Sequence, residues 1–278
     1  MGPVLAALSA VVYGCADFCG GLATRRSPAT TVTVSSQLAG LVVLVIAAPI
    51  VGGHGDLIHA LLIGAIGGLA GGVGVVLLYG ALAIGTMSIV SPVTAVCAAT
   101  VPLVVGLALG DRPRSLAIVG LACSIAAIVL VSFSPGRERS RAAFNVLLLS
   151  LGAGVAFGAF YVALSKAGHD TGLWPLVGSR PVSMVVALVL ARIRHEPALS
   201  PRAQVRMVAG AGLLDMTANV LFLIATRHGQ LAVVGVLGSL YPVSTVALAR
   251  TVGKERLRPL QVVGFALALA ALVLTAVV

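Results

Sequence analysis

Ten apolar runs of about 20 residues, joined by very short connections, constrain the fold of this chain more than any other feature. A helix that crosses a membrane needs about 20 mostly apolar residues. The runs are continuous, whereas a membrane-spanning strand alternates polar and apolar residues. The expected spans are residues 3–24, 30–52, 57–80, 86–109, 115–133, 143–165, 172–193, 204–226, 230–252 and 258–277. The pattern therefore predicts an all-α integral membrane protein with ten transmembrane helices.

Charged residues are too scarce to cover a water-soluble surface. They make up 9% of the chain, against about 25% in a typical soluble domain. The net charge of +10 comes from basic residues between the apolar runs, where they can meet lipid headgroups. We therefore expect a multi-pass protein of the cell membrane, in contact with the bilayer and with no nucleic-acid partner. The four cysteines fall inside apolar runs, so no disulfide framework is expected.

The two halves of the chain resemble each other when one is shifted by 144 residues. Asp-Arg-Pro-Arg-Ser-Leu at 111–116 then aligns with Glu-Arg-Leu-Arg-Pro-Leu at 255–260, and Gly14 aligns with Gly158. Because each repeat has an odd number of helices, five, the second copy must enter the membrane inverted relative to the first. Such inverted repeats are typical of alternating-access transporters, whose substrate site lies near the midplane. The expected division is a first repeat at 1–135, a linker at 136–142 and a second repeat at 143–278.

Each copy closes with an acidic-Arg turn followed by a glycine-bearing helix, and this arrangement resembles the EamA family of the drug/metabolite transporter superfamily. The matching residues are Asp111-Arg112 with Gly120, Glu255-Arg256 with Gly264, and Tyr241-Pro242. The first copy departs from the family pattern, because it has Asp111 where Glu is usual and Ala98 opposite Pro242. The resemblance implies two inverted five-helix repeats and transport of small metabolites, often outward.

Two acidic residues lie in the middle of expected spans. Ionisable groups inside a membrane are expensive to bury, so each is a candidate functional group. Asp17 in the first span could exchange a proton, and it resembles by position an acid used in other branches of the superfamily. Its structural alternative is an ion pair or a cap on a broken helix. Asp215 has Asn219 one turn later on the same face, and the alternative for this polar stripe is hydrogen bonding between helices.

Arg180 lies inside the seventh span, where two roles are open. Its guanidinium could bind a substrate carboxylate or phosphate in a bidentate fork. It could also neutralise Asp215 or Asp17, and this pairing is the favoured interpretation. The tyrosines within spans are expected to line a cavity rather than to anchor the interface, because Tyr13 and Tyr161 lie too deep in their spans for anchoring. Tyr13 also shares a helix face with Asp17. The tyrosines within spans are Tyr13, Tyr79, Tyr161 and Tyr241.

Other motifs favour packing over chemistry. The spacing of Gly64, Gly68 and Gly72 predicts close helix contact. Cys15 and Cys19 lie four residues apart, but Asp17 projects to the opposite side of that helix, so no metal site is predicted. No cofactor-binding, nucleotide-binding or hydrolytic motif is present in the sequence, and no enzyme is expected.

These observations predict a secondary active transporter that moves a small metabolite, amino acid or drug by alternating access. Export, coupled to protons through Asp17 or Asp215, is the leading hypothesis. The alternative is a flippase for a lipid-linked substrate, with Arg180 at the headgroup and a lateral opening between helices. Both halves lie in one chain, so a monomer would suffice, and a dimer is also compatible.

Two arguments about orientation disagree. Thirteen of the 18 Lys and Arg lie in the first, fifth, seventh and ninth connections, and four lie in the connections that face the other side. The positive-inside rule places the first set in the cytoplasm and both termini outside. The family resemblance implies the reverse, so the sequence leaves the orientation open.

Overall fold

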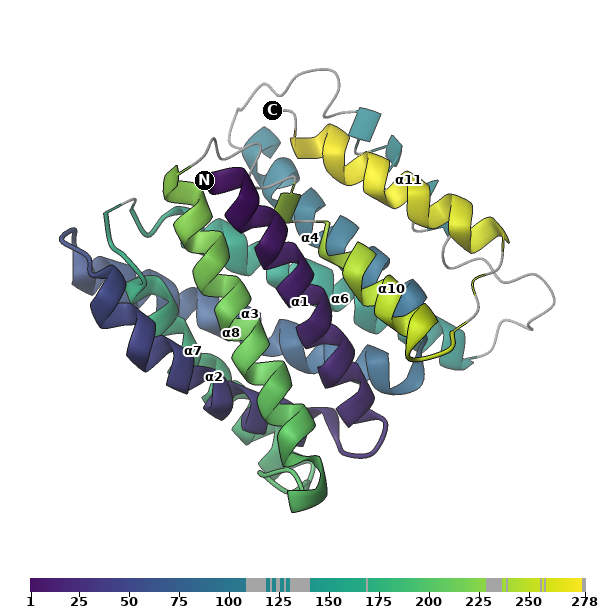
Figure 1. Cartoon of the computed structure of the whole chain (residues 1–278), viewed down its shortest axis with the longest axis horizontal. Helices are drawn as coiled ribbons and strands as arrows, with labels where there is room; N and C mark the ends of the chain where they lie inside the picture. Colours follow the sequence, from purple (N-terminus) through teal and green to yellow (C-terminus); the bar gives the residue numbers. More distant parts are fainter. Residues whose placement is uncertain are drawn as a thin grey trace.

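The computed structural model is a bundle of long helices with both chain ends at one end of the bundle (Figure 1). It describes residues 1–108, 119–120, 122–123, 126–127, 129–130, 141–168, 170–228, 237–238, 240–255, 257 and 259–276. Within these ranges there is no strand. The α-helices are α1 (Gly2–Thr24), α2 (Ala29–Val51), α3 (Leu57–Ile84), α4 (Met87–Ala108), α6 (Arg141–Ser165), α7 (Trp174–Ile193), α8 (Val205–His228), α10 (Tyr241–Thr251) and α11 (Pro259–Ala276). A short 3-10 helix, η1 (Arg202–Gln204), precedes α8.

The helices are long and apolar enough to make this a multi-pass membrane protein. Among the described residues, six segments could cross a bilayer by length and composition, and two shorter apolar helices cover Met87–Val101 and Pro259–Ala271. The six segments are Gly2–Thr24, Ala29–Val51, Leu57–Ile84, Ala143–Leu164, Trp174–Ile193 and Arg202–Ala225. The expected count of ten also rests on spans at 115–133 and 230–252, of which 11 of 19 and 8 of 23 residues lie outside the described residues.

Capping residues explain several helix ends. Pro28 stands at the N-cap of α2, and the side chain of Asp56 caps α3 by accepting a hydrogen bond from the His59 N–H at 2.9 Å. The expected third span stops at residue 80, but α3 continues to Ile84 and ends at Gly85. The reason is that the residues after Gly80 are good helix formers, so an isolated glycine does not end the helix.

Contacts at the two ends of the bundle show that the second half is inverted relative to the first. At one end, the Glu255 carboxylate after α10 binds Arg25, which follows α1. At the other end, a ring nitrogen of His59 near the start of α3 lies 3.1 Å from the Lys166 carbonyl, just after α6. Because α1 and α3 run in the same direction, α6 runs opposite to its counterpart α1. The inverted arrangement expected from the repeat is thus present in the packing.

Equivalent glycines make equivalent contacts in the two halves. Gly14 on α1 packs against α10, where an added Cβ would lie 2.7 Å from the Tyr241 carbonyl oxygen. Gly158, its counterpart on α6, packs against α4, where an added Cβ would lie 3.0 Å from the Ala98 carbonyl oxygen. The helix pairs α1–α10 and α6–α4 therefore share one type of close interface.

The glycines of α3 let α7 approach closely, as their spacing predicts. Gly64, Gly68 and Gly72 face the backbone of α7, and a Cβ on Gly72 would lie 2.8 Å from the Ser183 Cα. In the other half, Gly212 of α8 packs in the same way against the Ser36 carbonyl of α2. These contacts hold α7 and α8 closely against helices of the first half.

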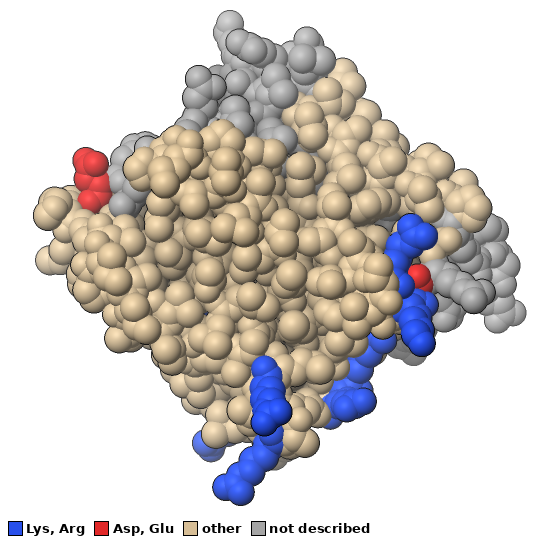
Figure 2. Space-filling model, in the orientation of Figure 1, with Lys and Arg blue, Asp and Glu red and all other residues tan. Residues whose placement is uncertain are grey.

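Basic side chains gather at one end of the bundle, and a broad face beside it carries no charge (Figure 2). The described Lys and Arg at this end follow α1, lie in or beside the α7–α8 connection, or lie at the end of α10: Arg25, Arg26, Arg192, Arg194, Arg202, Arg206, Arg250 and Lys254. Exposed apolar side chains such as Val42 and Val45 cover the flank of the bundle. The molecule thus has a lipid-facing belt and one strongly basic end.

Candidate functional site

An ion pair between α7 and α8 forms the centre of the candidate site. The Arg180 guanidinium donates to the Asp215 carboxylate at 3.0 Å, which confirms the pairing interpretation for this arginine. The Arg180 side chain is 8% exposed and that of Asp215 is 30% exposed. Arg180 has almost no access to solvent, so a counter-charge is required to hold it there.

Two amides complete the coordination of this pair. Arg180 also donates to the side-chain oxygen of Gln37 on α2. The Asn219 amide donates to the Asp215 carbonyl at 2.8 Å and lies 3.4 Å from its carboxylate. Three helices therefore meet at one polar cluster, defined here as the polar cluster of Gln37, Arg180, Asp215 and Asn219. Gln37 was not expected from the sequence, although a glutamine inside an apolar span is a usable signal.

Asp17 on α1 has no ion pair or hydrogen bond to any residue in the described ranges. It interacts electrostatically with Asp215, because α1 packs along α8. Arg180 is already neutralised by Asp215, so it does not serve as the counter-ion of Asp17. The site thus holds one paired carboxylate and one carboxylate without a partner of opposite charge among the described residues.

The four tyrosines gather around these acids. Each of them interacts electrostatically with Asp17, and Tyr13, Tyr79 and Tyr161 also interact with Asp215. The rings of Tyr13 and Tyr241 have centroids 6.2 Å apart, so α1 and α10 meet there through aromatic side chains. All eight candidate residues chosen from the sequence therefore lie in one region of the bundle interior.

The tyrosines differ in how freely they can meet a ligand. Tyr79 is 4% exposed and its ring fills the space beside Gly20 of α1. Tyr161 packs against Phe222, with ring centroids 6.4 Å apart. Tyr13, Tyr161 and Tyr241 are each partly exposed. These three rings are therefore the ones available to line a cavity, whereas Tyr79 is part of the packed core.

A second polar cluster closes the basic end of the bundle. Glu255 accepts hydrogen bonds from the Met87 and Ser88 N–H groups, both at 3.1 Å, at the start of α4. It also pairs with Arg25 at 3.0 Å. A carboxylate is stabilised at a helix N-terminus, so Glu255 joins the ends of α1, α4 and α10. This contact gives a structural role to the acidic residue of the repeat motif, while its counterpart Asp111 lies outside the described residues.

No metal centre is found in the part of the chain that the structure describes, where no three His, Cys, Asp or Glu side chains come together. Cys15 and Cys19 are partly buried thiols on α1, without a disulfide.

Two inverted halves around an interior charged cluster define a class, the multi-pass membrane transporters built from two repeats. The EamA-like transporter family matches residues 1–133 and 144–277, so the two matched segments correspond to the two repeats. This chain belongs to that family, which is part of the drug/metabolite transporter superfamily.

Comparison with other proteins supports the fold. A solved structure titled "Crystal structure of protein" matches 98% of this chain and 96% of its own, with a TM-score of 0.66 and 17% sequence identity. At that identity the likeness concerns the fold alone. No curated protein matches the chain by sequence.

Proposed function

We propose that this protein is a secondary active transporter of the cell membrane that exports a small molecule by alternating access, in exchange for protons carried by Asp17. The observation that carries the proposal is the contrast between two neighbouring carboxylates. Asp215 is neutralised by Arg180 at 3.0 Å, whereas Asp17 has no cationic partner within the described residues.

The electrostatics of the site suggest how coupling would work. A charged carboxylate without a partner is strongly disfavoured in a membrane interior. Asp17 is therefore stable either with a proton or with a cationic group of the substrate, but not with both. This exclusion is what a proton-exchange mechanism requires. A permanently paired Asp215 is less suited to the task, because its charge is already compensated.

The surroundings of Asp17 favour substrates that carry an amino group. Tyr13, Tyr161 and Tyr241 present partly exposed rings near the carboxylate, and aromatic faces attract ammonium groups. A zwitterionic amino acid, a related metabolite or a cationic drug fits this combination. The helix contacts at Gly14 and Gly158 would be the surfaces along which the two halves rock.

The test uses the purified protein in liposomes that contain a trapped pH-sensitive dye. Amino acids, organic cations, nucleosides and lipid-like anions are added in turn, and substrate-driven proton movement is recorded at two external pH values. We expect an amine-bearing substrate to drive proton movement in wild type and in Asp56→Asn, a control acid at the exposed start of α3. The signal should be lost in Asp17→Asn.

The alternatives give different results. Proton movement that survives Asp17→Asn but disappears in Asp215→Asn would transfer the coupling role to the paired acid. Substrate uptake without proton movement in every variant would refute proton coupling. Movement of lipid-like anions alone would favour the flippase hypothesis.

A further inference from the structure

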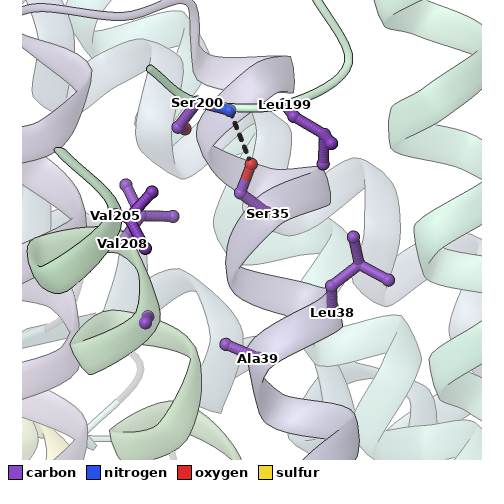
Figure 3. Close-up of a pocket in the computed structure, with 8 residues that line it drawn as sticks. Ser35, Leu38, Ala39, Leu199, Ser200, Val205 and Val208 are labelled. Carbon is purple, nitrogen blue, oxygen red and sulfur yellow. Dashed lines mark hydrogen bonds between the residues drawn. The ribbon is translucent and has the colours of Figure 1, made fainter. Parts of the chain in front are cut away.

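A pocket of about 260 Å³ lies between α2 and α8 at the basic end of the bundle (Figure 3). Its walls are formed by Leu38 and Ala39 of α2 and by Val205 and Val208 of α8, and Leu199 and Ser200 of the α7–α8 connection line the rest. Gln37 projects from a different side of α2, where it bonds Arg180. The pocket is thus distinct from the interior polar cluster.

The pocket faces the lipid rather than the interior of the bundle. Leu38 of α2, Leu199 of the α7–α8 connection and Val205 of α8 are 41%, 61% and 49% exposed, so the pocket opens to the surface between apolar side chains. An apolar hollow of this kind in the lipid-facing belt meets hydrocarbon chains. Its chemistry therefore fits an acyl chain better than a water-soluble solute.

Polar atoms at the end of the pocket lack partners. The Ser200 N–H donates to the Ser35 hydroxyl at 2.9 Å, which ties the connection to α2. The Ser200 hydroxyl and the Gln204 side-chain oxygen are buried and have no hydrogen-bond partner in the described ranges. Of these two residues, only Ser200 lines the pocket. Buried polar atoms are normally hydrogen-bonded, so the Ser200 hydroxyl is suited to a ligand that offers an acceptor group.

Positive charge surrounds this end of the pocket. Arg202 lies two residues after Ser200, and Arg206 follows Val205 directly, and both side chains are exposed. Neither arginine forms an ion pair within the described residues. The acid of the connection, Glu196, accepts a hydrogen bond from Thr30 instead. Arginine forks recognise phosphate groups, and basic pockets between transmembrane helices bind anionic headgroups.

We propose that this pocket binds one anionic phospholipid of the bilayer. Its acyl chain occupies the apolar hollow between α2 and α8, and its phosphate meets Arg202 and Arg206. The Ser200 hydroxyl donates to an ester or phosphate oxygen of the lipid. The lipid then joins α2 to the α7–α8 connection at the membrane surface. This site is independent of the transport proposed above.

Native mass spectrometry of the full chain tests the site. The protein is released from micelles that contain phosphatidylglycerol or phosphatidylcholine with identical acyl chains, and the lipid-bound fraction is measured. We expect phosphatidylglycerol to be bound at least fivefold more than phosphatidylcholine. The double variant Arg202→Gln and Arg206→Gln should lose this preference. The matched control, Arg250→Gln with Lys254→Gln at the end of α10, removes the same charge elsewhere and should keep it.

A second variant separates the acyl chain from the headgroup. Ala39→Phe fills the hollow without changing any charge, and we expect it to lower binding of both lipids. A gel-filtration retention volume equal to that of wild type shows that a variant is folded. If Ala39→Phe does not fold, the two double charge variants alone decide the outcome. The proposal is overturned if phosphatidylcholine binds equally well in wild type, or if both double charge variants lose phosphatidylglycerol to the same extent.

Discussion

Replacing Asp215 by asparagine tests how much the ion pair with Arg180 contributes to the free energy of unfolding. The substitution keeps the size of the side chain and an oxygen that can accept a hydrogen bond, but it removes the charge opposite Arg180. Arg180 then remains as a guanidinium that is 8% exposed and has only neutral partners. The perturbation is thus electrostatic rather than steric.

The structure sets the expected magnitude. Removing one partner of a fully buried pair costs about 3–5 kcal/mol. Asp215 is 30% exposed and Gln37 still accepts from Arg180, so the cost should be lower, about 2–3 kcal/mol. Arg180→Gln should cost about 2 kcal/mol, because the remaining carboxylate keeps some access to solvent. The double variant leaves no unpaired charge, so it should be about 2 kcal/mol more stable than the sum of the single effects predicts.

Titration with a denaturing detergent measures these free energies of unfolding. The fluorescence of Trp174, the single tryptophan, reports on α7, and reaction of the native thiols with a dye gives a second probe. Agreement between the probes is required before the four free energies are combined. The free energy of unfolding lost in the double variant is compared with the sum of the losses in the two single variants. If they agree within about 0.5 kcal/mol, the two side chains do not stabilise each other and the reasoning fails.

Three further predictions concern packing, capping and orientation. Gly212→Ala should destabilise the protein by about 1–3 kcal/mol, because the added methyl group would collide with α2. The control Gly210→Ala meets nothing within 4 Å and should be neutral or stabilising by up to about 1 kcal/mol. Equal effects of the two substitutions in the unfolding titration would contradict the packing. Glu255→Ala should cost about 1–2 kcal/mol through loss of the α4 cap and the Arg25 pair, while the exposed Asp170→Ala should change little, and the same titration compares them. The positive-inside rule places the N-terminus outside the cytoplasm, so a reporter that works only outside the cytoplasm should be active when it is fused there. Activity of a cytoplasmic reporter at the same position would instead support the orientation that the family resemblance implies.

The sequence predicts those features that depend on one helix at a time. Apolar runs of sufficient length have no alternative in a bilayer, so most described helices follow the expected spans closely. The exception is the expected span 230–252, where α10 begins only at Tyr241, after a turn at Leu240. The pairing of Arg180 with an acid could be foreseen, because a lone guanidinium is unstable inside a membrane. The sequence offered both Asp215 and Asp17 as the acid, and it could not decide between them or predict Gln37 as the second partner, since both depend on which helices lie side by side. The same applies to Glu255, whose role at Met87 requires the ends of three helices to meet.

The paired contacts of Gly14 and Gly158 have a consequence for the energy landscape of the molecule. Since the two halves are built alike and inverted, a conformation in which they exchange roles would contain nearly the same set of interfaces. The energy difference between the two forms is then set by residues that lack an equivalent in the other half. Arg180 and Asp215 are such residues, because Ser36 and Gly71 stand at the corresponding positions. Residues such as Arg180 and Asp215 therefore contribute to the free-energy difference between the two forms, so a single substitution can change which form is more populated.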